Sequence, residues 1–489
     1  MTILLKIWSG WVNNMVSAVE KGGEAEAEPE SDLSYFFEPR SVAIIGALRE
    51  GWFGGYVIIK NLRLFGFPGE IYPVNPRYDK VLGLDVYASI KDVPATVDLV
   101  IIITPAATVP GILEECGDAG VRAAIVVSDG FAERSEEGAK LQEELVGIGR
   151  REGVRILGPN TVGVTNTANG LVTTPYEFGY SSIRRGYVAL AGQTGIIAPQ
   201  AVPYEDLQYG VSKICDFGNK CDVDETDLLE YLAEDAETKV IAMYLEGIKD
   251  GRRFLATAKR VVERKPVIVL KSGRSEEGAR VASSHTGTLA GDDRIYEAAF
   301  RQVGVLRVRN FRELFEIPKI FGQPRPKGNR IAIITMTGGA GVMSTDVAYE
   351  CSLELARFSE KTISELEKIF PSLAKNPSDV GPAMFAGDLV QIYKKTIEAA
   401  LEDENVDCVS VVLWTGEAAP PQLYVELFNE LKEKASKPIA IWIYGTKVTA
   451  VHELSRELEK LDFPVFLDFE TAVRALGMLC EYSRLQGDA

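Results

Sequence analysis

The sequence predicts an α/β protein built from about three units, each with strands of a parallel sheet and covering helices. Apolar runs of four to seven residues alternate along the chain with segments that have helical patterns. Several of these runs end in glycine-rich or polar turns. The 489 residues correspond to about three domains at ~150 residues each. We therefore expect three α/β units in succession along the chain.

The composition is that of a globular protein, with 46% hydrophobic and 25% charged residues. A formal net charge of −17 argues against nucleic acid or an anionic membrane as a general partner, because both require a basic face. No apolar run reaches the ~18 residues of a membrane-spanning helix, so we expect a cytoplasmic protein. The six cysteines lack Cys-x-x-Cys spacing and only two histidines accompany them, which predicts reduced, mostly buried cysteines and no metal site.

Residues 1–34 precede the first unit. Apolar residues recur about every four positions between residues 3 and 19, which predicts an amphipathic helix that docks on a partner or a surface. A signal peptide is the alternative, since Val16-Ser17-Ala18 resembles a cleavage site, but no basic segment precedes the apolar part. A further interpretation is that this N-terminal segment results from an upstream start codon. Residues 22–32 are acidic and predict a solvated linker.

The first unit, residues 35–156, has the pattern of a doubly wound nucleotide-binding domain, with a helix at 109–119. Its buried strands are predicted at residues 42–45, 70–74, 99–103 and 123–127. A ligand is expected at the loops after them, at residues 46–55, 75–77, 104–106 and 128–130. The first loop reads Gly46-Ala47-Leu48-Arg49-Glu50-Gly51 and lacks the second glycine of the dinucleotide fingerprint, so NAD is weakly supported. Glycines that only make tight turns are the alternative for each loop.

The second unit, residues 157–324, has strands predicted at 187–190, 239–245 and 266–270. Gly192-Gln193-Thr194-Gly195 follows the first strand and leads into a predicted helix, a setting that binds anions. Glu246 lies at the carboxyl end of the second strand, and Lys271 and Arg274 follow the third.

His285 lies in a long loop predicted after the third strand, among small polar residues that include Ser284, Thr286 and Gly287. A neutral imidazole nitrogen is an available nucleophile near pH 7, and small neighbours would let a charged group approach it. We therefore expect a transiently phosphorylated histidine. A carboxylate such as Glu246 could accept the imidazole N–H and stabilise the charged ring. The alternatives are a histidine with one structural hydrogen bond and a glutamate that is merely solvated.

A proline-rich hinge at 323–328 marks the boundary of the third unit, residues 325–489. Its strands are predicted at 330–334, 408–413 and 438–444, and a helix is predicted from Met343. The glycine-rich turn at 337–341 is either an anion contact or a tight strand-to-helix connection.

Seven motifs occur in an order that resembles the α subunit of the ADP-forming (NDP-forming) acyl-CoA synthetases, of the acetyl-CoA synthetase type and related to succinyl-CoA synthetase. They are Ser41-Val42-Ala43-Ile44-Ile45-Gly46, Ile71-Tyr72-Pro73-Val74-Asn75-Pro76, Gly158-Pro159-Asn160, Gly218-Asn219-Lys220-Cys221-Asp222-Val223-Asp224-Glu225, Tyr244-Leu245-Glu246-Gly247, Leu270-Lys271-Ser272-Gly273-Arg274 and Ser284-His285-Thr286-Gly287. The resemblance covers about residues 35–489, and the ordered set is far more specific than any single piece.

The resemblance implies a CoA-binding Rossmann-like domain followed by two flavodoxin-like, succinyl-CoA-ligase-like domains. It implies that acyl-CoA, ADP and phosphate give acid, ATP and CoA through an acyl phosphate and a phosphohistidine at His285, which Glu246 stabilises. The implied phosphate-binding residues are Gln193, Thr194, Gly195, Ser284, Thr286 and Gly287. Coenzyme A is expected at Gly46, Ala47, Asn75, Pro76, Arg77, Thr104 and Pro105, with Arg77 or Lys80 at the adenosine 3′-phosphate.

The chain lacks a segment suited to bind ADP with Mg²⁺, so the resemblance implies a separate ATP-grasp β subunit that holds most of the Mg-ADP or Mg-ATP contacts, in an α2β2 assembly. A CoA-sensing regulatory module without turnover is the alternative, and a NAD-linked dehydrogenase is a more distant one. The sequence does not identify the acid or the preference for ADP over GDP.

Three loops depart from the family pattern. Gly192-Gln193-Thr194-Gly195 replaces Ser-Gln-Ser-Gly, and Thr161 replaces the cysteine of Gly-Pro-Asn-Cys. The first CoA loop usually begins Gly-Ala-Ser and contains a proline and a lysine, whereas here it carries Trp52 and Phe53. We expect this loop to change CoA affinity or to reshape the acyl pocket.

Overall fold

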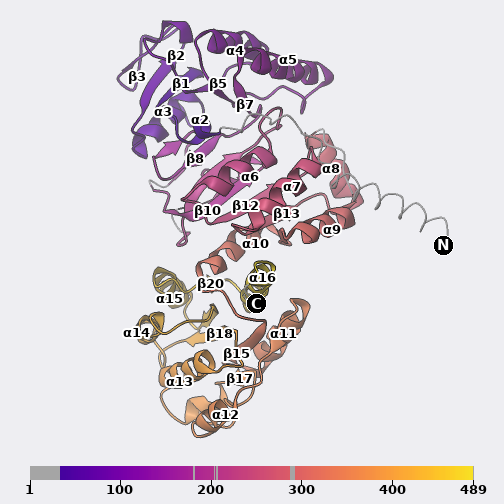
Figure 1. The fold of residues 1–489 in the computed structure, drawn as a ribbon. Coiled ribbons are helices and arrows are strands. Elements are labelled where there is room, and N and C mark those ends of the chain that lie inside the picture. Colours follow the sequence, from indigo (N-terminus) through magenta and orange to yellow (C-terminus); the bar gives the residue numbers. More distant parts are fainter. Residues whose placement is uncertain (1–32, 180–181, 203, 205–206, 287–291, 488–489) are drawn as a thin grey trace, which may run out of the picture.

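The computed structural model describes residues 33–487 except 180–181, 203, 205–206 and 287–291, and for residues 282–286 it describes the backbone alone. The predicted N-terminal helix and acidic linker lie outside the described residues. The described chain forms three stacked α/β tiers that follow one another in sequence (Figure 1). The predicted α/β fold with parallel sheets is therefore confirmed.

The first tier contains a five-stranded parallel sheet in the order β2-β1-β5-β6-β7. Its strands are β1 (Ser41–Gly46), β2 (Glu70–Val74), β5 (Leu99–Ile103), β6 (Ala123–Val126) and β7 (Arg155–Leu157), beside a small hairpin of β3 (Lys80–Val81) and β4 (Leu84–Asp85). Its helices are α2 (Ser34–Phe37), α3 (Gly55–Leu64), α4 (Val109–Asp118) and α5 (Glu136–Glu152). The four predicted strands are confirmed, because continuous apolar runs suit strands buried on both faces. The sheet extends to Leu157, one residue beyond the predicted limit of this unit.

The second tier contains a seven-stranded sheet in the order β14-β13-β12-β10-β11-β8-β9. Its strands are β8 (Val164–Asn166), β9 (Leu171–Val172), β10 (Arg185–Gly192), β11 (Val211–Asp216), β12 (Val240–Leu245), β13 (Val267–Lys271) and β14 (Leu306–Arg307). Its helices are α6 (Glu225–Glu234), α7 (Gly251–Val262), α8 (Glu276–Thr286), α9 (Asp293–Val303) and α10 (Phe311–Glu316). The sheet is mixed, because β8 pairs antiparallel with both β11 and β9.

The third tier contains a parallel sheet in the order β16-β15-β18-β19-β20, with β17 beside β15. Its strands are β15 (Arg330–Thr335), β16 (Glu354–Leu355), β17 (Ser378–Asp379), β18 (Cys408–Thr415), β19 (Ile439–Gly445) and β20 (Val465–Phe466). Its helices are α11 (Gly338–Glu350), α12 (Glu360–Glu367), α13 (Leu389–Glu402), α14 (Pro421–Lys432), α15 (Val448–Lys460) and α16 (Phe469–Leu485). The three predicted strands are confirmed, and three two-residue strands extend the sheet.

One hydrophobic cluster crosses all three tiers. It includes Phe36 and Phe37 of α2, Ile214 of β11 and Leu476 of α16, all almost fully buried. Helix α16 runs between the second and third sheets (Figure 1), and Gln486 after it donates a hydrogen bond of 2.8 Å to the Val262 carbonyl at the end of α7. The tiers therefore pack against each other through continuous apolar contacts.

Five of the six cysteines are buried and free, and Cys351 is half-buried and free. Burial raises the pKa of the Cys116 and Cys221 thiols to about 12, so both are protonated near pH 7. Across the described part of the chain, the helices are all too short or too polar to span a bilayer.

Candidate functional site

The loops predicted to bind CoA meet at one edge of the first sheet. Strand β1 lies between β2 and β5, so the crevice above it is the switch point where doubly wound sheets bind ligands. The side-chain amide of Asn75 donates to the Gly46 carbonyl at 3.0 Å, and its oxygen accepts from the Arg77 amide at 2.9 Å. Gly46 needs to be glycine, because a Cβ there would lie 2.1 Å from the Ile103 carbonyl oxygen at a φ of +122°. The structure thus brings together the predicted CoA residues Gly46, Ala47, Asn75, Pro76, Arg77, Thr104 and Pro105.

A cavity of about 480 Å³ lies between the first and second tiers. It joins loops at the carboxyl ends of β6, β10 and β11 with the loop before α3. Its lining consists of Phe53, Val127, Asp129, Asn160, Thr161, Val162, Pro175, Tyr176, Gln193, Thr194, Gly195, Gln200, Asp216, Gly218 and Asn219. Three predicted phosphate-binding residues, at 193–195, are therefore in this cavity.

The side-chain amide of Gln193 is fixed through its oxygen, while its nitrogen makes no hydrogen bond among the described residues. Its oxygen accepts hydrogen bonds from the backbone N–H of Glu246 at 2.8 Å and of Gly247 at 3.1 Å. Its nitrogen is buried and has no hydrogen-bond partner among the described residues. A buried amide donor without a partner is unfavourable, so this nitrogen is suited to a ligand oxygen in the cavity.

The helix predicted after Gly195 is only a single 3-10 turn, Gly195–Ile197. The expectation of a helix N-terminus that attracts anions is therefore wrong, because one turn has no appreciable macrodipole. The hydroxyl oxygen of Thr194 accepts a hydrogen bond of 3.4 Å from the Ile196 amide. Anion binding at this turn would depend on Gln193, Thr194 and individual backbone N–H groups.

Asp216 is a candidate site residue that the sequence did not indicate. It ends β11, lines the cavity and accepts hydrogen bonds from the amides of Val162 at 2.8 Å and Gly218 at 3.3 Å. Burial raises the pKa of its carboxyl to about 6, although these hydrogen bonds lower it. The available signal was its place before Gly218-Asn219, but Ser212 and Lys213 interrupt the apolar pattern of this strand.

Glu246 lies at the carboxyl end of β12, as predicted, and is half-buried. Its carboxylate accepts a hydrogen bond of 3.2 Å from the Tyr244 hydroxyl. Lys271, at the end of the neighbouring strand β13, lies 4.5 Å above the Tyr296 ring. Burial lowers the pKa of Lys271 to about 8, while Asp293 and Glu246 oppose this shift. The second sheet thus places a carboxylate and an easily deprotonated amine on adjacent strand ends.

The backbone of His285 lies in the last turn of helix α8, so the predicted long loop is wrong at this position. The Ser275 hydroxyl accepts from the Gly278 amide at 3.0 Å and caps the helix, and Glu276 and Glu277 favour its first turn. The side chains of Ser284, His285 and Thr286, and all of Gly287, lie outside the described residues. The other histidine, His452, is exposed in the second turn of α15 (Val448–Lys460).

A buried ion pair contacts the backbone directly after Glu246, at Gly247. The Lys220 ammonium lies 2.7 Å from the Glu225 carboxylate and 2.8 Å from the Gly247 carbonyl oxygen, and the two side chains are 3% and 0% exposed. Lys220→Met should lower the free energy of unfolding by about 3–5 kcal/mol, because it leaves the buried Glu225 carboxylate without its countercharge. Chemical denaturation would measure this loss.

The matched control is Lys361→Met, which breaks an exposed pair with Glu402. Its effect should stay within about 0.5–1 kcal/mol, because water screens such pairs. If both variants lost the same free energy of unfolding, the buried Lys220–Glu225 pair would contribute no more to stability than an exposed pair.

The glycine-rich segment of the third tier is not a separate turn. Helix α11 begins at Gly338, and the Thr337 hydroxyl caps it by accepting from the Ala340 amide at 3.3 Å. The helix therefore starts before the predicted Met343, and the glycines form its first turn. Of the two predicted alternatives, this geometry fits the tight strand-to-helix connection.

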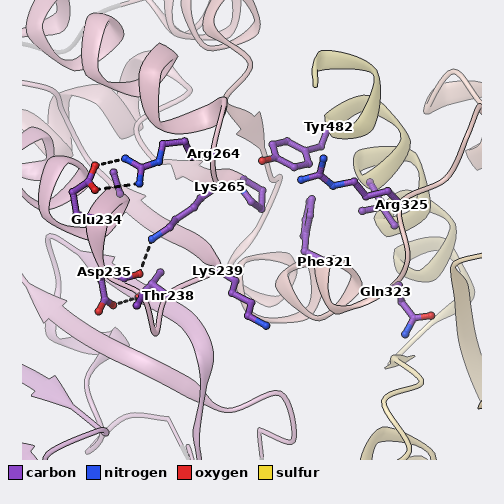
Figure 2. Close-up of a pocket in the computed structure, with 14 residues that line it drawn as sticks. Glu234, Asp235, Thr238, Lys239, Arg264, Lys265, Phe321, Gln323, Arg325 and Tyr482 are labelled. Carbon is purple, nitrogen blue, oxygen red and sulfur yellow. Dashed lines mark hydrogen bonds and ion pairs between the residues drawn. The ribbon is translucent and has the colours of Figure 1, made fainter. Parts of the chain in front are cut away.

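A second hollow, of about 450 Å³, lies between the second and third tiers (Figure 2). Figure 2 shows Arg264 paired with Glu234, and Lys265 directed to the Asp235 carbonyl at 2.7 Å. Arg325 lies against the ring of Tyr482, at 5.7 Å from its centre. This hollow contains none of the predicted site residues. Within the described residues, no cluster of three or more metal-ligating side chains is present.

Comparisons with known proteins agree with this geometry. Residues 40–167 match a CoA binding domain and residues 185–321 match a succinyl-CoA ligase like flavodoxin domain. The chain is 40% identical to "Acetate--CoA ligase [ADP-forming] II subunit alpha" of Pyrococcus furiosus, over 93% of this chain and 99% of that one. It is also 40% identical to "Acetate--CoA ligase [ADP-forming] II" of Archaeoglobus fulgidus, over 93% of this chain and 67% of that one.

Among solved structures, the dinucleotide forming acetyl-coenzyme A synthetase 1 of Ca. Korarchaeum cryptofilum, in complex with phosphate and ADP, superposes with a TM-score of 0.85 at 34% identity. The match covers 94% of this chain and 98% of that one. The CoA-binding fold, the order of the motifs and these relatives lead to one conclusion: the chain belongs to the family of ADP-forming acetate–CoA ligase α subunits.

Proposed function

We propose that this chain binds acyl-CoA and carries the phosphohistidine of a cytoplasmic ADP-forming acyl-CoA ligase. The observation that supports this most directly is the buried, unpartnered nitrogen of Gln193, which lines a cavity between the CoA-binding tier and the second tier. A phosphate or acyl phosphate oxygen there would satisfy this donor. The backbone N–H of Glu246 fixes the side chain of Gln193, which lines this cavity.

The reaction runs in three transfers. A phosphate oxygen attacks the thioester carbonyl, the carbon–sulfur bond breaks, and CoA leaves as the thiol after taking up a proton. A His285 ring nitrogen then attacks the phosphorus of the acyl phosphate and releases the acid. ADP finally takes the phosphoryl group from His285 and forms ATP. Each step exchanges one high-energy bond for another, so little free energy is lost.

The residues divide this work. Coenzyme A is bound by the loops of the first tier, through Gly46, Ala47, Asn75, Pro76, Arg77, Thr104 and Pro105. The phosphoryl group is bound in the second tier, by Gln193, Thr194, Gly195, Ser284, Thr286 and Gly287. Glu246 accepts the N–H of the His285 ring and stabilises the phosphorylated imidazole. The name of the Pyrococcus furiosus relative includes a subunit designation, which supports a partner chain. We propose an ATP-grasp β subunit in an α2β2 assembly, with the Mg-ADP contacts mainly on that partner.

A CoA-sensing module without turnover is the second candidate. The chain retains both His285 and Glu246, which such a module would not need. This favours the enzyme.

The isolated chain should bind CoA yet make no ATP from acyl-CoA, ADP and phosphate, and adding the ATP-grasp partner should restore synthesis. Arg77→Ala should weaken CoA binding about 10- to 100-fold, because a charge-assisted hydrogen bond to the 3′-phosphate is lost. Lys80 lies 3.4 Å from the Asp85 carboxylate, which leaves Arg77 as the more available cation. Calorimetric titration with CoA measures the affinity.

The control is Arg357→Ala, an exposed cation of the third tier, which should leave CoA affinity unchanged. ATP synthesis by the isolated chain, or CoA protection of the third tier in place of the first, would contradict the proposal.

A further inference from the structure

Three aromatic side chains form a cluster beside the cavity between the first two tiers, and two of them, Phe53 and Tyr176, line it. We call Trp52, Phe53 and Tyr176 the aromatic wall. The ring centres of Phe53 and Tyr176 are 4.8 Å apart, and the Trp52 ring lies 6.0 Å from each of them. The wall unites the loop between β1 and α3 with a segment of the second tier that is more than 100 residues away in the sequence.

Backbone hydrogen bonds hold the wall in place. Gly54 donates to the Pro175 carbonyl at 2.9 Å, and Glu177 donates to the Trp52 carbonyl at 3.0 Å, in an antiparallel bridge between Phe53 and Tyr176. Lys60 of α3 adds an ion pair with Glu177. The side chains nevertheless stay accessible, since Trp52 is 69% and Phe53 39% exposed. A fixed backbone that presents large exposed aromatic rings is typical of a binding surface.

The cavity beside the wall has two chemically different sides. Phe53, Pro175 and Tyr176 give it an apolar side, and polar groups that include Gln193, Thr194 and Asp216 give it the other. A thioester carbonyl placed at the polar side would direct its acyl substituent to the apolar side. The adenosine end of CoA would lie elsewhere, near Arg77.

We propose that the aromatic wall binds the acyl group, and that the preferred acids of this enzyme carry a bulky apolar or aromatic substituent. The inference rests on the proposed function, because it assigns the substrate class of that same cavity. An acetyl group is too short to cover the wall, whereas an aryl-substituted acyl chain would bury the exposed faces of Phe53 and Trp52 and could pack against them in offset or edge-to-face geometry. Tyr176 supplies the matching surface from the second tier.

The test measures the affinity of the full chain for three ligands, 3-phenylpropanoyl-CoA, acetyl-CoA and CoA, by calorimetric titration. This readout does not need the partner subunit. Wild-type protein should bind 3-phenylpropanoyl-CoA at least roughly 10-fold more tightly than acetyl-CoA. Phe53→Ala should abolish most of that preference, because apolar pockets discriminate by roughly 10- to 200-fold through such contacts. Tyr176→Ala, on the other tier, should reduce it as well and guards against a folding defect in one variant.

The matched control is Phe385→Ala, which removes an aromatic ring that is 88% exposed in the third tier. It should preserve the preference. Equal wild-type affinity for the two thioesters would overturn the proposal, and so would an equal loss for all three ligands in Phe53→Ala, which would assign the wall to the CoA arm. If none of the three ligands bound the wild-type chain, the proposed function itself would be contradicted, and the inference would fall with it.

Discussion

His285→Ala should abolish phosphate labelling of this chain. Wild-type protein incubated with acyl-CoA and radiolabelled phosphate, without ADP, should acquire an acid-labile and base-stable label. The reason is that the phosphoramidate forms before the nucleotide is needed, and alanine has no nitrogen to accept the phosphoryl group. The remaining alternative acceptor, His452, lies in helix α15 of the third tier, apart from the cavity that contains Gln193 and Thr194.

The control for this experiment is His452→Ala, which should keep full labelling. Mass spectrometry of the labelled peptide locates the phosphate independently of the variants. Label that persists in His285→Ala would overturn the assignment of the phosphorylated residue.

Glu246→Gln should slow phosphohistidine formation by roughly 10²- to 10⁴-fold while preserving the fold and CoA binding. The amide keeps the shape and can still form hydrogen bonds, but it offers no negative charge to a phosphorylated imidazole. The backbone N–H of Glu246 would still bind the Gln193 oxygen, so the Gln193 amide should stay in place. Rapid-quench labelling measures the rate.

Two further variants separate charge from position. Tyr244→Phe removes the hydroxyl that donates to Glu246 and should cause a smaller loss, since it affects only the orientation of the carboxylate. Glu263→Gln removes an exposed charge beyond α7 and should have no effect. Wild-type rates in Glu246→Gln would leave this residue as a solvated group at a strand end.

The sequence was sufficient to predict the strands whose apolar residues are continuous, such as β1 and β5. It did not reveal β11, because Lys213 is polar and yet buried: its ammonium lies 2.7 Å from the Asp235 carboxylate, in a side chain that is only 3% exposed. Short antiparallel strands such as β8 were missed because their stability comes from neighbours distant in sequence. His285 was expected in a loop because its neighbours are small and polar, but its backbone continues the capped helix α8.

The candidate site was predictable residue by residue but not as a cavity. Gln193 and Glu246 were identifiable from motifs, but their mutual hydrogen bond depends on the pairing of β10 with β12. Nothing in the local pattern around Phe53 shows that it faces Tyr176, because that contact arises only when two tiers pack. Asp216 became recognisable through its burial, which a sequence pattern does not record.

The hydrophobic cluster that crosses all three tiers limits how the proposed enzyme can move its cargo. Separating two tiers would expose apolar surface at a cost of about 2.5 kcal/mol for every ~100 Å². Swinging a whole tier between the CoA cavity and a nucleotide on another subunit would therefore be expensive. In the proposed mechanism, the phosphoryl group would therefore have to move with a short segment of the chain or meet a moving partner subunit, while the three packed tiers keep their relative positions.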